Sequence, residues 1–268
     1  MQNQILDLFG ILRSEYVHAH GRASTDLLIQ KLDCNPSERI LEIGVGTGTT
    51  MALLASNYRR TNFYGTDLSS LMLTTAQKRI SFCGLSSNTQ LHLQKNESCV
   101  SFENDFFEKV YVESVLGIQE GDELKHWLVE LFRILKPGGK LIMNETIWLE
   151  STSKETANKV NKKCKAAFGI IQSNIDCLHV DNWKSVLSKL GFTDIEAINL
   201  DGSEVENRVT FPIYSGLRSK LFSGIGKLKI WLNPTVNRQW RHQSNRMTTI
   251  MSDRPKLMNG FLISCKKG

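Results

Sequence analysis

A short glycine-rich loop holds the first residues that could bind a ligand. Three glycines alternate with other residues in the run Glu42-Ile-Gly44-Val-Gly46-Thr-Gly48, directly after an apolar stretch. Glycine permits a tight turn and lets the backbone come close to a ligand. Asp67 ends the next apolar stretch, and its carboxylate could accept hydrogen bonds from two ribose hydroxyls. The loop and the acid together indicate a nucleoside-binding site.

Glu42 helps to choose between two classes of nucleoside ligand. A dinucleotide-binding loop spaces its glycines as GxGxxG and points a helix N-terminus at a pyrophosphate. Here the spacing is GxGxG, and Glu42 stands two positions before the first glycine. A carboxylate in this place repels a phosphate but attracts the ammonium group of an amino acid. The sequence therefore favours a cationic nucleoside that carries an amino acid, and a nicotinamide-dependent reductase is the alternative.

Apolar stretches separated by loops must position these residues. Short apolar runs alternate with segments whose apolar side chains recur at helical spacing. Ser69 is expected to cap the helix that Gly84 ends, and Asp181 to cap a later helix. The pattern predicts an α/β fold, a Rossmann-like, seven-stranded and mostly parallel sheet with helices on both faces. The strands are expected at or near residues 39–44, 62–66, 91–93, 109–116, 140–144, 193–200 and 260–265.

Three segments fall outside this alternation. Residues 1–32 are expected to form an N-terminal helical arm, residues 150–178 a helical insertion, and residues 203–256 a long excursion before the last strand. Segments of such length are more often lids or binding segments than idle loops. We therefore expect a single domain, residues 1–268, with a cofactor-binding core at residues 33–149 and two substrate-lid insertions.

Three motifs resemble those of a known enzyme family in order and spacing. ILEIGVGTG, YGTDLSSLML and RILKPGGKL are similar to successive motifs of the class I S-adenosylmethionine-dependent methyltransferases, within residues 35–200. The resemblance implies that S-adenosylmethionine is the cofactor and lies over the carboxyl ends of the first strands. It implies these roles: Glu42 faces the methionine part, Gly44, Gly46 and Gly48 line the cofactor, Asp67 holds the ribose, Leu68 packs on the adenine, and Asn96, beside Glu97, reaches the adenine amino group.

Glu113 is the residue that we expect to act on the methyl acceptor. It falls at the carboxyl end of the fourth strand, where such sheets place ligands. The pair Glu113-Ser114 resembles that of sterol and tocopherol carbon methyltransferases, in which the carboxylate lies near the reacting centre. The alternative is a carboxylate that only bonds local backbone groups. Tyr16 and His18, on the predicted arm, are further candidates for contact with the substrate, and His20 and His179 are weaker ones.

No metal site, membrane span or secretory signal is expected. The histidines of His18-Ala-His20 have no acidic partner at suitable spacing, and the six cysteines form no CxxC pair. Scattered cysteines favour idle thiols in a reducing cytoplasm. No run of about 18 apolar residues occurs, and the first twenty residues lack a basic start. The sequence favours a cytoplasmic protein.

The excursion at residues 203–256 holds most of the positive charge. Ten lysines and arginines against three acids give it a net charge of +7, whereas the whole chain carries +6. One interpretation is a solvated lid whose apolar face covers the sheet. Others are a grip on an anionic, apolar substrate or contact with a membrane surface, and a nucleic-acid partner is not expected. The apolar residues that recur at helical spacing are Leu217, Leu221, Phe222, Ile225, Leu228, Trp231 and Leu232.

These features favour an enzyme that uses S-adenosylmethionine to methylate a small, apolar or anionic molecule. The acceptor atom, carbon, oxygen or nitrogen, stays open, and so does the oligomeric state. Carbon methylation of an isoprenoid, a prenyl diphosphate or a lipid is a hypothesis that rests on Glu113 and on the basic, apolar excursion. A non-catalytic module that binds S-adenosylmethionine is the alternative from another functional class.

Overall fold

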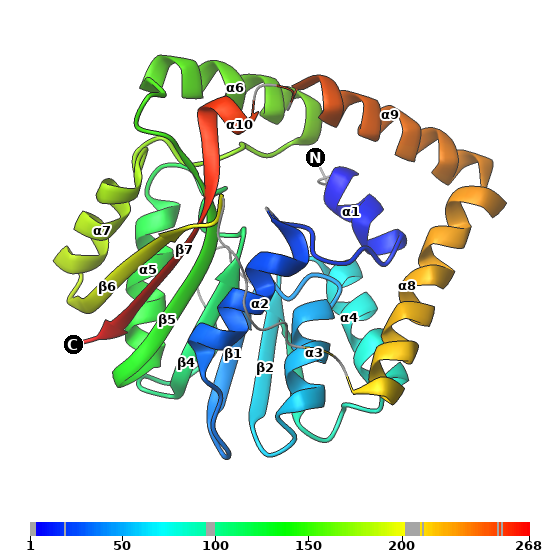
Figure 1. The fold of residues 1–268 in the computed structure, drawn as a ribbon, viewed down its shortest axis with the longest axis horizontal. Coiled ribbons are helices and arrows are strands. Elements are labelled where there is room, and N and C mark those ends of the chain that lie inside the picture. Colours follow the sequence, from blue (N-terminus) through cyan, green and yellow to red (C-terminus); the bar gives the residue numbers. More distant parts are fainter. Residues whose placement is uncertain are drawn as a thin grey trace.

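The computed structural model describes residues 4–18, 20–94, 100–201, 210, 212–250, 252 and 254–268, and Figure 1 shows their arrangement. Seven strands form one sheet in the order β3-β2-β1-β4-β5-β7-β6. The pairs from β3 to β5 run parallel, and β7 runs antiparallel to both β5 and β6. The predicted seven-stranded, mostly parallel sheet is confirmed. The strands are β1 (Arg39–Ile43), β2 (Asn62–Asp67), β3 (Thr89–Leu93), β4 (Phe107–Glu113), β5 (Leu135–Trp148), β6 (Phe192–Asn199) and β7 (Met258–Lys267).

Helices cover both faces of this sheet. Side chains alternate between the faces along each strand, so Ile40 packs with Leu28 on one side and Leu41 packs with Trp127 and Trp183 on the other. The helices in chain order are α1 (Gln4–Ile11), α2 (Gly21–Leu32), α3 (Thr49–Asn57), α4 (Ser70–Phe82), α5 (Glu123–Ile134), α6 (Lys154–Phe168), α7 (Val180–Lys189), α8 (Ile213–Leu232), α9 (Pro234–Ile250) and α10 (Arg254–Leu257). The helices α2, α3 and α4 form the first layer, and α5 and α7 the second.

Local signals set several of the boundaries. Ser69 caps α4 as predicted, because its side chain accepts a hydrogen bond from the backbone N–H of Met72 at 3.2 Å. The prediction that Asp181 caps α7 is wrong. The N-cap is His179, whose backbone N–H donates to Asn182 Oδ1 at 2.9 Å, and Asp181 lies inside the first turn.

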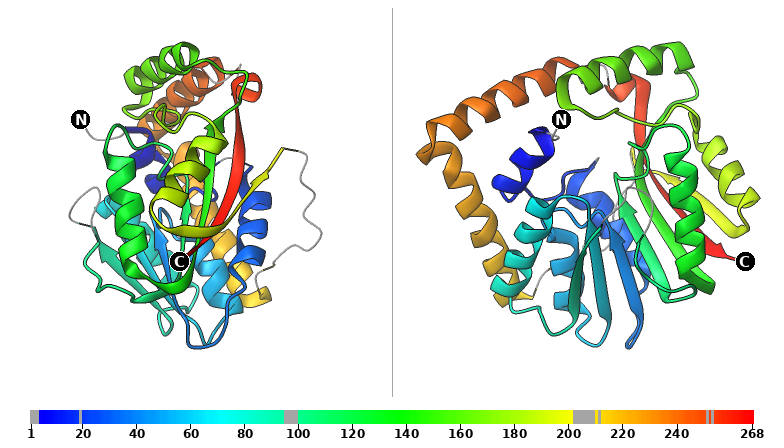
Figure 2. Two further views of the ribbon diagram at one scale, coloured as in Figure 1. Left: turned by 90° about the vertical axis from the view of Figure 1, so that its left-hand side faces the viewer. Right: turned by 180° about the vertical axis from the view of Figure 1, so that it is seen from behind.

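The predicted N-terminal arm consists of two parts with different surroundings. The second part, α2, belongs to the core, since Leu28 and Leu32 are fully buried in the same layer as α3. The first part, α1, contacts α4 and α9 instead. The views in Figure 2 show α6 and α9 meeting beyond the carboxyl ends of the strands, on the side where α1 lies.

The late excursion forms a frame along one side of the molecule. α8 packs against α3 and α4, and α9 then continues past α1 to α6. Among the residues that the structure describes, no helix is long and apolar enough to cross a membrane. α8 and α9 thus form an attached helical pair that packs mainly against other helices.

Candidate active site

A cavity of about 920 Å³ lies at the carboxyl ends of the first strands. Glu42 of β1, Asp67 of β2 and Glu113 of β4 all line it, although the three are far apart in sequence. The parallel order β2-β1-β4 brings these three strand ends side by side. Residues from α1 and Ile170, just after α6, complete the wall on the outer side.

The glycine loop bends sharply between β1 and α3. Gly44, Gly46 and Gly48 all have positive φ, at 73°, 53° and 75°, which other residues rarely adopt. A Cβ on Gly44 would also lie only 2.4 Å from Cγ2 of Val115. Gly44 and Gly46 line the cavity. Gly48 does not, because it is the N-cap of α3 and packs against Ala76 of α4.

Asp67 joins the glycine loop to the start of α4. Its Oδ2 accepts a hydrogen bond from Gly46 N–H, and its Oδ1 accepts one from Ser69 N–H, both at 2.8 Å. Burial raises the pKa of Asp67, and the backbone hydrogen bonds act in the opposite direction. Leu68, the next residue, is half exposed and lines the same cavity. Asn96 and Glu97, the other two residues expected near a cofactor, lie outside the described residues.

Glu42 is a buried carboxylate that faces the cavity. Its Oε2 accepts a hydrogen bond from the hydroxyl of Tyr111 at 2.7 Å. Burial raises its pKa well above the usual value, and the nearby carboxylate of Glu113 raises it further. Among the described residues, no lysine, arginine or histidine forms an ion pair with Glu42. A cationic ligand group beside Glu42 would offset the cost of ionising it.

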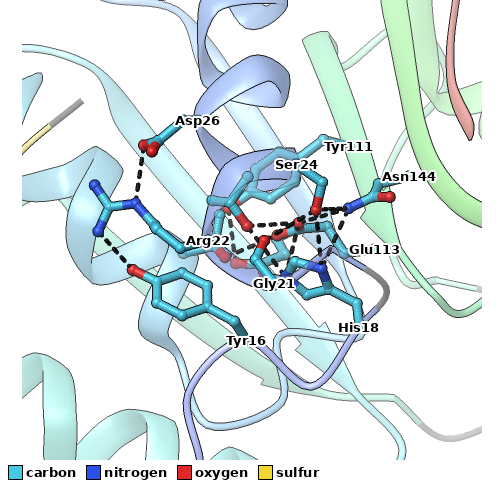
Figure 3. A network of polar contacts seen from close by, with 12 residues as sticks. Tyr16, His18, Gly21, Arg22, Ser24, Asp26, Tyr111, Glu113 and Asn144 are labelled. Atoms are coloured by element: carbon cyan, nitrogen blue, oxygen red, sulfur yellow. Dashed lines mark hydrogen bonds and ion pairs between the residues drawn. The ribbon is translucent and has the colours of Figure 1, made fainter. Parts of the chain in front are cut away.

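Glu113 is held by four side chains, and Figure 3 shows this network. Its Oε1 accepts a hydrogen bond from Thr50 Oγ1 at 2.7 Å. Its Oε2 accepts from Thr25 Oγ1 at 2.9 Å and from Asn144 Nδ2 at 3.2 Å, and lies 3.1 Å from His18 Nε2. These contacts tie His18 and α2 to the end of β4 and to the neighbouring part of β5. The alternative of bonds to local backbone groups alone is wrong, because these partners are side chains from distant parts of the chain.

Tyr16 and His18 extend this network along the N-terminal segment. The Tyr16 hydroxyl accepts a hydrogen bond from Arg22 Nη1 at 2.9 Å, and Arg22 Nε donates to Asp26 Oδ1 at 2.8 Å. The Tyr16 ring meets the His18 ring edge to face, with centroids 6.1 Å apart. Burial raises the pKa of Tyr16, and the positive charge of Arg22 acts against this shift. Both Tyr16 and His18 line the cavity, and their contact with a substrate stays a prediction.

Two other histidines lie elsewhere. His20 is exposed and its Nε2 lies 3.2 Å from Asn259 Oδ1, while His179 caps α7. Neither lines the cavity. Within the described part of the chain, no group of three or more histidines, cysteines or acids is arranged to hold a metal ion.

Several residues of the site carried no sequence signal. Thr25, Thr50 and Asn144 come from α2, α3 and β5, and only the fold brings them together around Glu113. On α5, Glu123 and Trp127 are four residues apart and both line the cavity. Glu123 Oε2 and Trp127 Nε1 are buried and have no hydrogen-bond partner among the described residues. Because both atoms are shielded from the cavity, they are unsatisfied polar groups of the wall and not exposed contact points for a ligand.

The cavity wall combines apolar side chains with carboxylates. Six acidic residues line it, and no lysine or arginine does so among the described residues. Of these acids, Glu120 pairs with Lys165, which lies outside the lining, at 2.6 Å. The acids are Asp7, Glu42, Asp67, Glu113, Glu120 and Glu123, and the apolar residues include Leu6, Ile11, Leu71, Met72, Ile118, Trp127 and Ile170.

The basic excursion does not contribute to this wall. None of its described residues lines the cavity. The prediction that its apolar face covers the sheet is wrong, because Phe222 alone of the seven predicted apolar residues is buried, and the others are exposed. We also expected that this segment could bind an anionic substrate, but none of its described residues contributes a side chain to the cavity.

The chain is similar to known methyltransferases. Residues 40–139 match the family model described as a methyltransferase domain. A protein of Bacillus subtilis, named as the uncharacterized methyltransferase YodH, is 30% identical over 204 residues, which is 76% of this chain and 79% of that protein. The ubiquinone/menaquinone biosynthesis C-methyltransferase UbiE of Wigglesworthia glossinidia brevipalpis is 30% identical over 140 residues, or 52% of this chain and 54% of its own.

A solved structure extends the similarity to the whole fold. Phosphoethanolamine N-methyltransferase 2 of Haemonchus contortus, in complex with phosphomonomethylethanolamine and S-adenosylhomocysteine, superposes with a TM-score of 0.69. The match covers 100% of this chain and 58% of that one, at 17% sequence identity. At this identity the likeness concerns the fold alone.

Proposed function

This chain belongs to the class I S-adenosylmethionine-dependent methyltransferases, and from that membership we propose that it methylates a small, largely apolar acceptor that is neutral or positively charged. The observation that carries the proposal is the part of the cavity wall not assigned to the cofactor, which has apolar side chains, the acids Asp7 and Glu123 without an ion pair among the described residues, and no described lysine or arginine. S-adenosylmethionine supplies the methyl group, which it carries on a positively charged sulfur. The acceptor must reach this group inside the same cavity.

The described residues fit this cofactor. The carboxylate of Glu42 is buried without a basic partner among them, so the cofactor's ammonium group would find a complementary charge there. Asp67 would hold the ribose hydroxyls while it keeps the bend of the loop at Gly46. The bare backbone of Gly44 and Gly46 leaves room for the cofactor to approach.

The charge of the wall argues for a neutral or cationic acceptor. A phosphate about 4 Å from an uncompensated carboxylate is disfavoured by about 4 kcal/mol near a protein surface. Several lining acids, Asp7 and Glu123 among them, form no ion pair with the described residues. A prenyl diphosphate would bring negative charge to this wall with no described cation to meet it. A phenol, a hydroxyquinone or an amine avoids that cost.

The leaving group is S-adenosylhomocysteine for every acceptor atom, and the acceptors differ in when they lose a proton. The similarity to a C-methyltransferase of ubiquinone/menaquinone biosynthesis supports an activated ring carbon on a neutral apolar molecule. An oxygen or nitrogen acceptor loses a proton as it gains the methyl group, and a carbon acceptor loses one afterwards. Catalytic roles for Glu113, Tyr16 and His18 stay predictions. With four partners, Glu113 is better suited to position His18 than to move toward an acceptor.

A transfer assay with methyl-labelled S-adenosylmethionine tests the proposal. Three acceptor groups are compared at equal concentration: phenols and hydroxyquinones, amines, and prenyl diphosphates, with products identified by mass spectrometry. We expect labelled product from the first or second group and none from the third. Product from prenyl diphosphates alone would overturn the charge argument. Cofactor binding by calorimetry, without turnover of any acceptor or of a metabolite extract, would favour a non-catalytic module.

A further inference from the structure

One side of α8 exposes a continuous row of large apolar residues. Ile213 and Trp231, near its two ends, are 84% and 85% exposed. At about 100° per residue, the exposed apolar residues fall within an arc of about 120°. We call this row the α8 outer face; its defining members are Leu217, Leu221, Ile225, Leu228, Trp231 and Leu232.

The opposite side of α8 is fixed to the protein by close contacts. Phe222, Ser219, Ser223 and Gly226 are buried there. A Cβ on Gly226 would lie 2.1 Å from the backbone oxygen of Leu12, so only glycine fits. The helix therefore cannot turn about its axis to bury the α8 outer face without losing these contacts.

Arg79 of α4 strengthens this attachment. Its guanidinium is completely buried and donates hydrogen bonds to Ser219 Oγ and Ser223 Oγ, both at 3.0 Å. Its Nε donates to the backbone oxygen of Thr47 in the glycine loop at 2.8 Å. Rotation of α8 would leave a buried charge without these partners, which is costly.

Basic residues border the α8 outer face on both edges. Lys220 and Lys227 fall on one edge and are exposed. Arg218 and Lys229 fall on the other edge, where they donate to the backbone oxygens of Phe82 at 2.8 Å and Ile11 at 3.1 Å. α9 adds Arg238, Arg241 and Arg246, and no aspartate or glutamate occurs from residue 213 to residue 250. The segment that carries this apolar face thus has seven positive charges and no negative one, four of the positive charges along the edges of the face.

We propose that the α8 outer face rests on the surface of an anionic lipid bilayer. An apolar row with basic residues along its edges matches a helix that lies in the plane of the membrane interface, with apolar side chains among the acyl chains and lysines at the headgroups. Both face-on views place α8 along the outer edge of the molecule, where a flat surface can contact its whole length. A protein partner or a second copy could cover the apolar row, but the one-sided charge favours an anionic surface.

Sedimentation with lipid vesicles tests the proposal. The whole protein is mixed with phosphatidylcholine vesicles, with and without phosphatidylserine, at low and high salt. We expect it to sediment with the anionic vesicles and to be released by salt, because charges at a membrane surface are screened within a Debye length. Equal binding to both kinds of vesicle, or binding to neither, would overturn the proposal.

Matched variants separate the α8 outer face from other surfaces. Lys220→Glu with Lys227→Glu should reduce binding to anionic vesicles at least about tenfold, whereas Lys125→Glu with Lys189→Glu makes the same charge change at exposed lysines of α5 and α7 and should not. Leu217→Ser with Leu221→Ser should also reduce binding. Val129→Ser is its control, since Val129 is an exposed apolar residue of α5. Equal losses in the test and control variants would refute the assignment.

Tryptophan fluorescence gives an independent readout. Trp231 is 85% exposed, whereas Trp127, Trp148 and Trp183 are buried. Anionic vesicles should shift the tryptophan emission to shorter wavelength. The Trp231→Phe variant should still sediment with these vesicles but should lose most of the shift. Light scattering of the free protein tests whether a second copy of the chain covers the α8 outer face instead. If the protein is a dimer that Leu217→Ser with Leu221→Ser converts to a monomer, and it does not bind vesicles, the face is a dimer interface and the bilayer proposal is overturned.

Discussion

The cavity and the α8 outer face differ in almost every physical property. The cavity is concave and acidic; Glu42 is buried, the Glu113 side chain is only 6% exposed, and both carboxylates accept hydrogen bonds. The α8 outer face is exposed, apolar and bordered by basic residues. The net charge of +6 therefore describes the excursion and not the place where a substrate would bind. A basic chain can have an acidic binding site, so total charge is a poor guide to a ligand.

The comparison also predicts how each region responds to solution conditions. Buried charges interact through protein, so salt affects them little, and their behaviour changes mainly when they gain or lose a proton. Exposed charges are screened by salt. The cavity should thus respond to pH and the α8 outer face to ionic strength. Four predictions, ordered from the largest expected effect to the smallest, test whether the two regions are as different as the structure indicates.

The largest effect should come from pH and Glu145. This buried carboxylate of β5 accepts hydrogen bonds from the backbone N–H groups of Val115, Leu116 and Gly117, next to the cavity. Burial raises its pKa to about 7, and those hydrogen bonds limit the rise. Since the folded protein holds this proton more tightly than the unfolded chain, the stabilisation is complete below the unfolded pKa and is lost as the pH rises through about 7.

Urea unfolding between pH 4.5 and pH 8 measures this effect. Glu145 should account for a loss of about 3 kcal/mol in the free energy of unfolding over this range. Glu145→Gln cannot ionise, so its stability should change less with pH. Parallel curves for the two proteins would show that Glu145 does not titrate as expected.

The next effect should come from Asp67→Ala. The change removes the carboxylate that accepts from Gly46 and Ser69 and that we expect to hold the ribose. Hydrogen bonds to a charged group contribute about 1.5–3 kcal/mol, so S-adenosylmethionine should bind about 100-fold more weakly in calorimetry. Leu217→Ser, on the α8 outer face, should leave this affinity unchanged. A similar loss in both variants would mean that the two regions are not independent.

Two glycines of α8 provide a third test. Gly226→Ala should destabilise the protein by about 1–3 kcal/mol, as overpacking does, because the new Cβ would meet the backbone of Leu12. Gly224→Ala is the matched control in the same helix, since nothing lies within 4 Å of its Cβ position. It should be neutral or should stabilise the helix by about 0.5–1 kcal/mol. Equal thermal stability of the two variants would contradict the packed inner side of α8.

The smallest of the four effects should come from Glu113→Gln. The glutamine side chain keeps part of the hydrogen-bond network. If Glu113 positions His18, the variant should lower kcat about tenfold, which is less than the 100-fold to 10,000-fold that a proton-transfer group contributes. The KM for S-adenosylmethionine should stay within about twofold, and the acidic limb of the kcat–pH profile should remain. A larger loss together with a lost limb would make Glu113 the proton acceptor. Unaltered turnover would remove it from the mechanism.

The sequence predicted those parts of the site whose residues lie close together in the chain. The glycine loop and Asp67 are adjacent to their strands, and the cap at Ser69 needs only residues within one turn. The seven-stranded, mostly parallel sheet followed from alternation and family resemblance, but its strand order and the antiparallel direction of β7 were not predicted. The partners of Glu113 were not predicted either, because Thr25 and Asn144 are ordinary polar residues of a helix and a strand that only the fold brings together.

The orientation of α8 shows a different limit. Helical spacing grouped six of the seven apolar residues correctly on one side, with Phe222 on the other, but spacing cannot tell whether a side faces the protein or away from it. Small side chains took the inner side, because Gly226 and Ser219 let α8 approach Leu12 and Arg79 closely. Only the contacts in three dimensions could decide this. Without them the large residues are the natural choice for the core.

Arg79 links α8 to the rest of the enzyme in a way that limits how the fold can be recombined. One guanidinium, whose pKa burial lowers to about 10, bonds to serines of α8, to Thr47 beside the cofactor loop and to the backbone oxygen of Arg13. A chimera that grafts α8 and α9 onto a related methyltransferase must therefore transplant this arginine with its serines. A graft of α8 and α9 without Arg79 should fold poorly. Loss of Arg79 from this chain should in turn disturb the glycine loop, because Thr47 would lose its hydrogen bond.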